Sequence, residues 1–518
     1  MTNRERISGV DTAWLRMERP TNLMMIVGVW MFERRLNIRD VKRILEKRFL
    51  AFRRFRQKAV EDAAGAWWED DDDFDLGRHV HRVSLPGAAG KRELEDLVSD
   101  LSSTPLDFSR PLWEFHVVDN YLGGSAIIMR IHHCYADGIA LVQVMLSLTH
   151  ETAEGSLKLP EDVVNEVASG DADFWEQILK PLTGALSGAA DIGRGLMEQG
   201  RDLAANPRLA AGTMQEAARK GMGFANEVAR LALMGRDSDT RFKGALGKAK
   251  RVAWAEPLPL DEVKAVGKAL GCSINDVLLS MAAGALRDYL QERGDPVDGI
   301  EIRAIVPVNL RPQGEGRGLG NRFGLVFLAL PLGMEHPLER LYEVRRRMLD
   351  LKGSYQPMIA LGLLSAVGYG PKALQEQVTA LLSSNASAVM TNVPGPQSPL
   401  YFAGKHIREL DFWVPQSGGI GMGVSILSYD GRIQFGVITD AGLVPDPDAI
   451  VSRFAEEFDK LMWVTLMSPW GEGAAEAVET PAPEASKPPT RAKKKSVTPG
   501  KAPSPPGDAK IPKRFRNL

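Results

Sequence analysis

Hydrophobic and polar positions follow two different periods over the first 150 residues of the chain. Apolar residues at helical spacing follow Asn37 and recur near residues 91–101, which predicts two helices. Apolar or alternating runs predict strands at 23–33, 112–118 and 125–131. Because these helices and strands are intermingled, the sequence predicts a first α+β domain over residues 1–159.

Residues 160–247 differ in composition and are rich in alanine, glycine, methionine and charged residues. Apolar residues at helical spacing begin at Phe174 and again at Met214, and they predict amphipathic helices. We interpret this segment as a helical linker that packs on the domains. A membrane-surface role is the alternative, which the acidic residues among the basic ones weaken.

A second α+β pattern covers residues 248–470. Helices are expected after Asp261, after Ser273 and over 447–462. Strands are expected at 301–308, 324–330, 386–392, 420–429 and 434–440. The sequence therefore predicts a second mixed domain of similar size.

The last segment, residues 471–518, consists mainly of Ala, Pro, Glu, Lys and Ser and becomes basic from Lys487 onward. A segment of this composition cannot bury a core, so we expect a disordered tail. Basic tails commonly bind an anionic surface, either lipid or nucleic acid. A purely solubilising role is the alternative.

Composition excludes several classes of protein. The 518-residue chain has a net charge of −2, which gives it no electrostatic bias toward nucleic acid. Its two cysteines, Cys134 and Cys272, predict neither a disulfide framework nor a structural zinc site, and a reducing, cytosolic setting fits. The first residues lack the apolar core of a signal peptide, and no run reaches the ~20 apolar residues that span a bilayer. Any membrane contact is expected to be peripheral.

The most informative segment is the run His-His-Cys-Tyr-Ala-Asp-Gly at 132–138, where a predicted strand ends and a predicted helix begins. An imidazole takes up a proton near neutral pH, and a carboxylate in the next turn can brace it, so the run suits a general base. His133 and Asp137 also have the spacing of metal ligands on a helix. The preceding residues predict a strand, however, and no further cluster completes a site, so we predict no metal. Ordinary packing of the two histidines is the third alternative.

Adjacent residues of a strand point to opposite faces, so His132 and His133 cannot both serve one site. One imidazole is expected to face the site and the other to be structural. Cys134 invites an interpretation as an acylated nucleophile. It points away from the site, however, if His133 faces it.

Further candidates lie elsewhere in the chain. Ser273 and Asp276 predict a helix cap, and Asn275 between them can donate its amide to an oxyanion or position a substrate. Trp113, in the run Arg-Pro-Leu-Trp, is interpreted as a core residue. The glycine-rich run at 314–320 fits neither a P-loop nor a Rossmann fingerprint.

The run at 132–138 resembles the HHxxxDG signature of the CoA-dependent acyltransferase superfamily, which includes chloramphenicol acetyltransferase and the condensation domains of peptide synthetases. Further segments narrow the resemblance to the bacterial wax ester synthase/diacylglycerol acyltransferases, from about residue 5 to 465. They lie at 11–16, 20–22, 111–113, 275–276, 306–311, 320–322 and 391–396. The resemblance implies two chloramphenicol-acetyltransferase-like mixed α/β domains with a channel between them.

The same resemblance implies roles for individual residues. His133 would be the general base, with His132 beside it and Asn275 assisting from the second domain. Asp137 would have a structural role and pair with an arginine, for which both Arg303 and Arg311 are candidates. Substrate-binding positions would include Gly138 and Asp276.

The function implied is direct transfer of a fatty acyl group from acyl-CoA, without an acyl-enzyme or a cofactor. The acceptor would be diacylglycerol, which gives triacylglycerol, or a long-chain alcohol, which gives a wax ester. The alternatives are an acyltransferase acting on another hydroxyl or amine and a catalytically silent coat protein of lipid bodies. We expect a cytoplasmic protein that associates peripherally with the inner face of the membrane or with lipid bodies.

Overall fold

Two main β-sheets organise the chain, and both belong to one unit formed by residues 1–467. The computed structural model describes residues 4–62, 65–136, 138–158, 234–309, 323–352, 354–369, 384–416 and 418–467. Most of the predicted linker over 160–247 and all of the predicted tail over 471–518 lie outside the described residues. Both therefore stay predictions.

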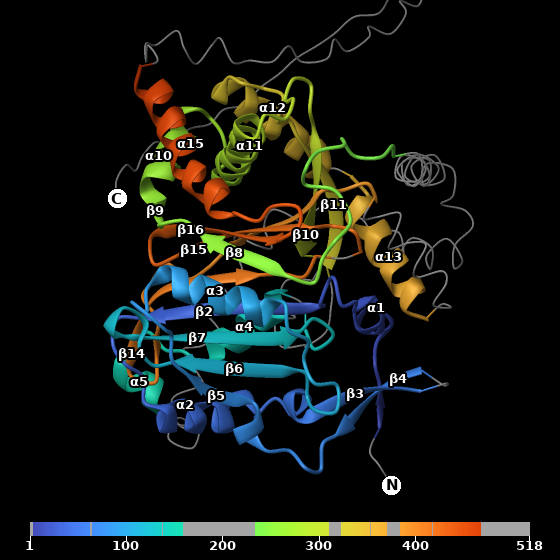
Figure 1. The fold of residues 1–518 in the computed structure, drawn as a ribbon, viewed down its shortest axis with the longest axis vertical. Coiled ribbons are helices and arrows are strands. Elements are labelled where there is room, and N and C mark those ends of the chain that lie inside the picture. The colour runs from blue at the N-terminus through green and yellow to red at the C-terminus, as the bar shows by residue number, and fades with distance from the viewer. Residues whose placement is uncertain are drawn as a thin grey trace, which may run out of the picture. The chain divides into compact units, whose positions relative to one another are not determined.

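The first sheet has six strands in the order β13-β14-β2-β7-β6-β5 (Figure 1). In that order they span Tyr401–Phe402, Lys405–Trp413, Met25–Phe32, Ser125–His132, Trp113–Val118 and Val80–Val83. The pair β5 and β6 is parallel, whereas the other neighbours are antiparallel. Every residue of β2 and β7 is buried. This explains why the sequence of both strands is a nearly continuous apolar run.

Strand β14 comes from the second half of the chain but lies beside β2 in the first sheet (Figure 1). Asp411 of β14 pairs with Val29 of β2. The sequence analysis identified no strand here, because Arg408 and Glu409 interrupt the apolar pattern. This strand exchange links the two predicted domains, whose boundaries stay predictions.

The first half of the chain also contributes helices. They are α1 (Gly9–Met17), α2 (Ile38–Ile44), α3 (Lys91–Ser102), α4 (Gly138–Ser147) and α5 (Ala153–Leu157). Asn37 caps α2 by accepting a hydrogen bond from the Arg39 N–H at 3.0 Å, as the sequence pattern predicts. A small sheet, β1-β4-β3, is formed by Glu5–Arg6, Gly65–Asp70 and Gln57–Asp62.

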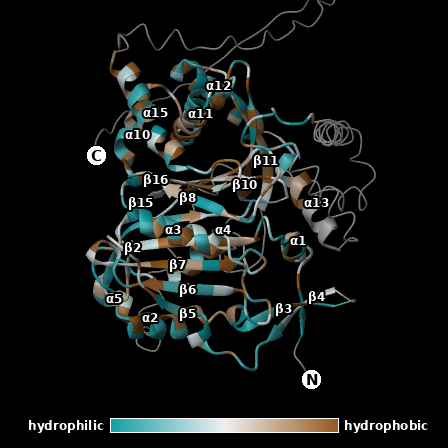
Figure 2. Ribbon diagram, viewed as in Figure 1, coloured by the Kyte–Doolittle hydropathy of each residue, from teal (hydrophilic) through white to brown (hydrophobic). Residues whose placement is uncertain are grey.

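The second main sheet has the order β11-β10-β12-β15-β16-β8, with β9 paired to β16. These strands span Phe323–Leu330, Ile302–Asn309, Ala388–Pro394, Met422–Tyr429, Arg432–Asp440, Lys250–Trp254 and Leu258–Pro259. The helices are α10 (Leu260–Ala269), α11 (Ile274–Glu292), α12 (Pro337–Lys352), α13 (Gln356–Tyr369) and α15 (Asp448–Met467). Figure 2 shows hydrophobic residues along the central strands and hydrophilic residues along much of α12.

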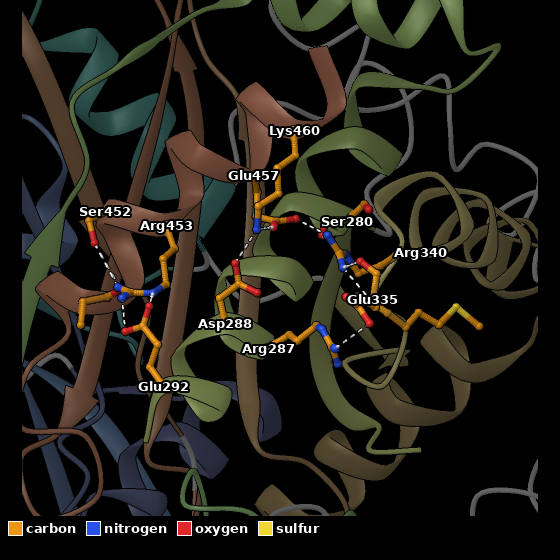
Figure 3. Close-up of polar contacts among 12 residues, drawn as sticks. Ser280, Arg287, Asp288, Glu292, Glu335, Arg340, Ser452, Arg453, Glu457 and Lys460 are labelled. Carbon is orange, nitrogen blue, oxygen red and sulfur yellow. Dashed lines mark hydrogen bonds and ion pairs between the residues drawn. The ribbon is translucent and has the colours of Figure 1, made fainter. Parts of the chain in front are cut away.

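An ion-pair network with a buried centre joins three of these helices (Figure 3). The guanidinium of Arg340 on α12 pairs with the carboxylate of Glu457 on α15, and both side chains are almost fully buried. Lys460 reaches the other oxygen of Glu457 and also Asp288 on α11, at 2.6 Å each. Gly284 on α11 makes this approach possible, because a Cβ there would overlap the Glu457 carboxylate.

Helix α3 covers the edge strand β8 of the second sheet. The backbone N–H groups of Lys250 and Val252 donate to Ser103 Oγ at 2.8 Å and Ser99 Oγ at 2.9 Å, respectively. The Trp254 N–H donates to Glu95 Oε1 at 3.2 Å. Side chains of the first half therefore accept the hydrogen bonds that a neighbouring strand would otherwise accept from the edge of the second sheet.

Within the described residues, no single helix is both long and apolar enough to cross a membrane. Helices α10 and α11 reach the required length and composition only as a pair, and they are bent by 100° at their break.

Candidate active site

The candidate site is the turn that follows β7. The strand ends at His132, and the chain turns through His133 and Cys134 before α4 begins. The His132 N–H donates to the carbonyl of Leu112 at 2.9 Å, and the His133 N–H donates to the carbonyl of Met24 at 2.7 Å. Leu112 directly precedes β6 and Met24 directly precedes β2, so backbone hydrogen bonds to both flanking strands fix the turn.

One ring nitrogen of His132 is hydrogen-bonded to the backbone, and the other faces a carboxylate. Its Nδ1 accepts a hydrogen bond from the Cys134 N–H at 3.1 Å. The proton of the neutral imidazole is therefore on Nε2, which lies 3.5 Å from Glu18 Oε2. The ring meets Phe108 edge-on, and the residue is 1% exposed. These contacts suit a structural histidine.

The imidazole of His133 has a different partner. It stacks on the indole of Trp14 in α1, with ring centroids 4.2 Å apart. The two histidines therefore contact different elements, as expected if only one of them serves the site. The assignment of His133 as general base stays a prediction.

The segment at 111–113 supports this turn directly. The Leu112 N–H donates to the Tyr135 hydroxyl at 3.0 Å, and that hydroxyl donates to the carbonyl of Gln57 at 2.6 Å. Since the Leu112 carbonyl also receives the His132 N–H, one residue is bonded to both ends of the turn. Trp113 is fully buried, which agrees with its interpretation as a core residue.

Glu18 is a site residue that the sequence analysis missed. Its carboxylate accepts the backbone N–H of Met24 and faces His132. Met24 also holds the turn through its carbonyl, so Glu18 acts on the turn by two routes. The one sequence signal is its position between the two opening segments, 11–16 and 20–22, that carry the family resemblance.

Cys134 lies next to the predicted base but is fully buried. Burial raises the pKa of its thiol well above the ordinary value, and the nearby carboxylates of Asp11 and Glu18 add to this effect. Nucleophilic attack needs the thiolate. The environment therefore opposes a covalent acyl-cysteine.

Asn275 and Asp276 lie at the start of α11. The Asn275 Oδ1 accepts a hydrogen bond from Asn392 Nδ2 at 2.6 Å, which joins the segments 275–276 and 391–396. Asp276 and Ser273 form a reciprocal capping box, with bonds of 2.9 and 3.2 Å, as the sequence predicts. The described contacts of Asp276 are those of a helix cap, and its substrate-binding role stays a prediction.

The remaining predicted residues are only partly described. Asp137 and Arg311 lie outside the described residues, whereas Gly138 starts α4. Arg303 donates its backbone N–H to Asp237 and its guanidinium to the carbonyl of residue 235. The arginine that pairs with Asp137 therefore stays open.

One group in the described part of the chain has the geometry to hold a metal ion. The ligand atoms of His81, Glu114 and His116 all lie within 4.8 Å of one another. The Glu114 carboxylate oxygen that faces His116 at 3.2 Å also accepts from Arg130 at 2.7 Å. A guanidinium on that oxygen competes with a cation, so the group is better satisfied as a hydrogen-bonded ion pair.

Comparisons with known proteins identify the family of this chain. The family model of the wax ester synthase/diacylglycerol acyltransferase catalytic domain matches residues 7–278, and that of the C-terminal domain of the same family matches residues 319–462. A probable diacylglycerol O-acyltransferase of Mycobacterium tuberculosis is 29% identical over 411 residues, which cover 78% of this chain and 83% of the relative. A relative from Mycobacterium bovis with a similar name shows the same identity and coverage.

Solved structures share the fold. The wax ester synthase/diacylglycerol acyltransferase from Marinobacter aquaeolei superposes with a TM-score of 0.60 at 18% identity, over 89% of this chain and 100% of that one. A starter condensation domain of rhizomide synthetase superposes with a TM-score of 0.54 at 12% identity, over 89% and 95% of the two chains. The expected fold, two chloramphenicol-acetyltransferase-like halves, is thus confirmed. With its histidine turn and both family domains in place, the chain belongs to the wax ester synthase/diacylglycerol acyltransferase family.

Proposed function

We propose that this protein transfers a fatty acyl group from acyl-CoA to the hydroxyl of diacylglycerol or of a long-chain alcohol. The observation that carries the proposal is the match of the catalytic family model over residues 7–278, which include the braced histidine turn. The names of the mycobacterial relatives support diacylglycerol as an acceptor.

In this mechanism His133 acts as general base. Its imidazole takes the hydroxyl proton while the acceptor oxygen attacks the thioester carbonyl carbon. The tetrahedral intermediate collapses, the carbon–sulfur bond breaks, and the imidazolium returns its proton to the CoA thiolate. The step releases an ester and free CoA without a covalent enzyme intermediate, in keeping with the buried state of Cys134. A positioned base of this kind typically contributes about 10²–10⁴-fold.

The remaining residues position this base. Glu18 and the Leu112 backbone hold the turn, and Trp14 supports the His133 ring. Asn275 uses its side-chain oxygen to accept from Asn392, which leaves its NH₂ group as a donor for the oxyanion of the intermediate.

The test uses purified protein with palmitoyl-CoA and either dioleoylglycerol or hexadecanol. We expect triacylglycerol or wax ester by mass spectrometry, with one CoA thiol released for each ester formed. The His133→Ala variant is expected to lose about 10²–10⁴-fold in kcat. If neither acceptor gives an ester, the proposed substrates are wrong, and if His133→Ala retains full activity, the proposed base is wrong.

We also propose a peripheral attachment to a lipid surface on the cytoplasmic side. At the end of α15, Trp463, Leu466 and Met467 are exposed by 57%, 66% and 77%. Their spacing places them on one face of the helix, and the sequence becomes basic further on, from Lys487. Such a combination of apolar and basic residues favours anionic membranes. Vesicle flotation with anionic lipids tests this, because Trp463→Ser and deletion of residues 472–518 should each reduce the bound fraction.

A further inference from the structure

Asn22 joins the two halves of the chain beside the histidine turn. It is 1% exposed, and its side-chain NH₂ group donates to the carbonyls of Gly418 at 2.9 Å and Ile420 at 3.1 Å. Two carbonyl oxygens need two donors, and an asparagine amide offers two N–H groups on one nitrogen. Both N–H groups of the Asn22 amide are therefore engaged by the second half.

On the side of the first half, the backbone of Asn22 is held in place. It exchanges two backbone hydrogen bonds with Arg19, of 2.9 and 3.1 Å. Met24, two residues further on, accepts the N–H of His133 at 2.7 Å, and its own N–H is bound by Glu18. The short stretch from Glu18 to Met24 therefore connects the Asn22 amide to the backbone of the proposed base.

On the side of the second half, the two accepting carbonyls lie where the chain crosses from one sheet to the other. Strand β14 of the first sheet ends at Trp413, and strand β15 of the second sheet begins at Met422. Within this crossing, the carbonyl of Gly421 accepts the N–H of Asp440 on β16 at 2.7 Å. The crossing is therefore bonded to Asn22 of the first half and to a strand of the second sheet.

The crossing leads to Asn275. Strand β15 pairs in parallel with β12, where Ile426 lies opposite Asn392. Asn392 in turn donates to Asn275 Oδ1 at 2.6 Å. A path of hydrogen bonds and short chain segments therefore runs from the backbone of His133 through Asn22 to the side chain of Asn275.

Other contacts hold the two halves together away from this path. Strand β14 pairs with β2, and side chains of α3 accept from the backbone of β8. None of these contacts uses the Asn22 side chain, so they are kept when its amide is removed. Loss of the amide should therefore disturb the alignment of the halves at the site without separating them.

We propose that Asn22 is a positioning residue that aligns His133 of the first half with Asn275 of the second. The proposal rests on the acyltransferase function proposed above, in which these two residues act on the same transfer. A purely structural role would lower stability alone. Alignment instead requires a loss of kcat that depends on Asn275.

The first test compares the steady-state kinetics of Asn22→Ala with those of wild type. We expect kcat to fall by about tenfold, because small misplacements of catalytic groups slow the reaction. The KM for palmitoyl-CoA should change little, since the lost alignment acts on the transition state. Asn22→Asp keeps the size of the side chain but offers no donor to the two carbonyls, so it should lose at least as much.

The matched control is Asn120→Ala. The Asn120 side chain also bonds two backbone groups of a distant segment, the N–H and the carbonyl of Leu85, at 2.8 and 2.9 Å. Both residues belong to the first half, and Asn120 follows the end of β6 that is opposite to Leu112. Asn120→Ala should therefore leave kcat unchanged even if it lowers the Tm.

A double-mutant cycle tests whether Asn22 acts through Asn275. Asn22→Ala should lower kcat by about tenfold when Asn275 is present, but by less than about twofold in an Asn275→Ala background. Equal fold-losses in the two backgrounds would overturn the proposal, because Asn22 would then act independently of Asn275.

Hydrogen exchange separates this proposal from the proposed reaction. Peptides that contain the amides of His133 and Asp440 should take up deuterium faster in Asn22→Ala than in wild type, whereas Asn120→Ala should leave both unchanged. Faster exchange in Asn22→Ala supports the alignment even if wild type forms no ester, and only the proposed function then fails. Unchanged exchange in both peptides would overturn the alignment.

A second variant keeps these tests decisive if Asn22→Ala does not fold. Asn22→Ser retains one hydroxyl donor for the two carbonyls, so it should change kcat and exchange in the same direction but by less. Wild-type kcat and wild-type exchange in a folded Asn22→Ser would then overturn the proposal.

Discussion

Glu18 Oε2 lies 3.5 Å from Nε2 of His132, and the same carboxylate accepts the backbone N–H of Met24. The carbonyl of Met24 in turn receives the N–H of His133. A single carboxylate at the end of α1 therefore reaches both histidines of the turn, one through its ring and the other through the backbone.

The first prediction concerns this carboxylate as a positioning group. Glu18→Ala removes the contact with His132 and the bond to Met24, so the turn should loosen and His133 should shift. A misplacement of about 1 Å in a catalytic group can reduce turnover by about 10²-fold. We expect kcat to fall by about 10- to 100-fold with little change in KM, while Glu18→Gln retains most of the activity because its amide oxygen still accepts the Met24 N–H.

Glu61 provides the matched control, since its carboxylate forms an exposed pair with Arg16 at 2.6 Å. Exposed pairs contribute only about 0–1 kcal/mol. Glu61→Ala should therefore leave kcat unchanged. Equal losses in both variants would show a general loss of folding rather than a role for Glu18.

The second prediction separates the two functions of the Asn275 amide. Asn275→Asp keeps the oxygen that accepts from Asn392 but removes the NH₂ donor. If this donor stabilises the oxyanion, Asn275→Asp and Asn275→Ala should both lose about 10²–10³-fold in kcat. Asn392→Ala, which only frees the amide to rotate, should lose less. Steady-state kinetics with saturating acyl-CoA measures the difference, and full activity in Asn275→Asp would rule out the donor role.

Local patterns predicted most elements of this fold but not how the two halves exchange parts. The helix after Asn37, the capping box at Ser273 and the strand that leads into His132 all follow from neighbouring residues. Strand β14 does not, because its polar residues are accommodated by partners such as β2 that are distant in sequence. Predicting β14 would require knowing that β2 lies beside it, and the pattern of apolar residues within β14 does not show this.

The candidate site shows the same division. The run at 132–138 identified the turn, because its chemistry lies in consecutive residues. The contact of Glu18 with His132 and the bond between Asn275 and Asn392 each join residues that are far apart in the sequence. Contacts between residues so far apart in the chain depend on how whole helices and strands pack. A single sequence therefore does not reveal them.

The third prediction concerns the dependence of stability on pH. Burial, with a further contribution from Glu409, raises the pKa of Asp411 to about 8. In the unfolded chain an aspartate titrates near 4. The native state therefore retains a proton that the unfolded state loses, so the free energy of unfolding should decrease as pH rises from about 4 to about 8 and level off above.

Asp411→Asn removes this titration and keeps the shape of the side chain. Its Tm should exceed that of wild type at pH 8, and the difference should shrink as the pH is lowered toward 5. Thermal unfolding followed by circular dichroism measures both values. Asp100→Asn, at an exposed position of α3, serves as control. A Tm difference for Asp411→Asn that is the same at every pH would contradict the assignment.

The fourth prediction concerns the buried pair of Arg340 and Glu457 (Figure 3). Glu457→Leu leaves the guanidinium buried without its carboxylate, and such losses cost about 3–5 kcal/mol. The double variant Arg340→Met/Glu457→Leu removes both charges, so it should recover most of the free energy of unfolding. As control, Asp350→Asn breaks the exposed pair with Arg346 and should change stability by less than about 1 kcal/mol. Urea unfolding at pH 7 measures all three variants, and a double variant less stable than Glu457→Leu would show that the pair itself, rather than the unpaired charge, determines the effect.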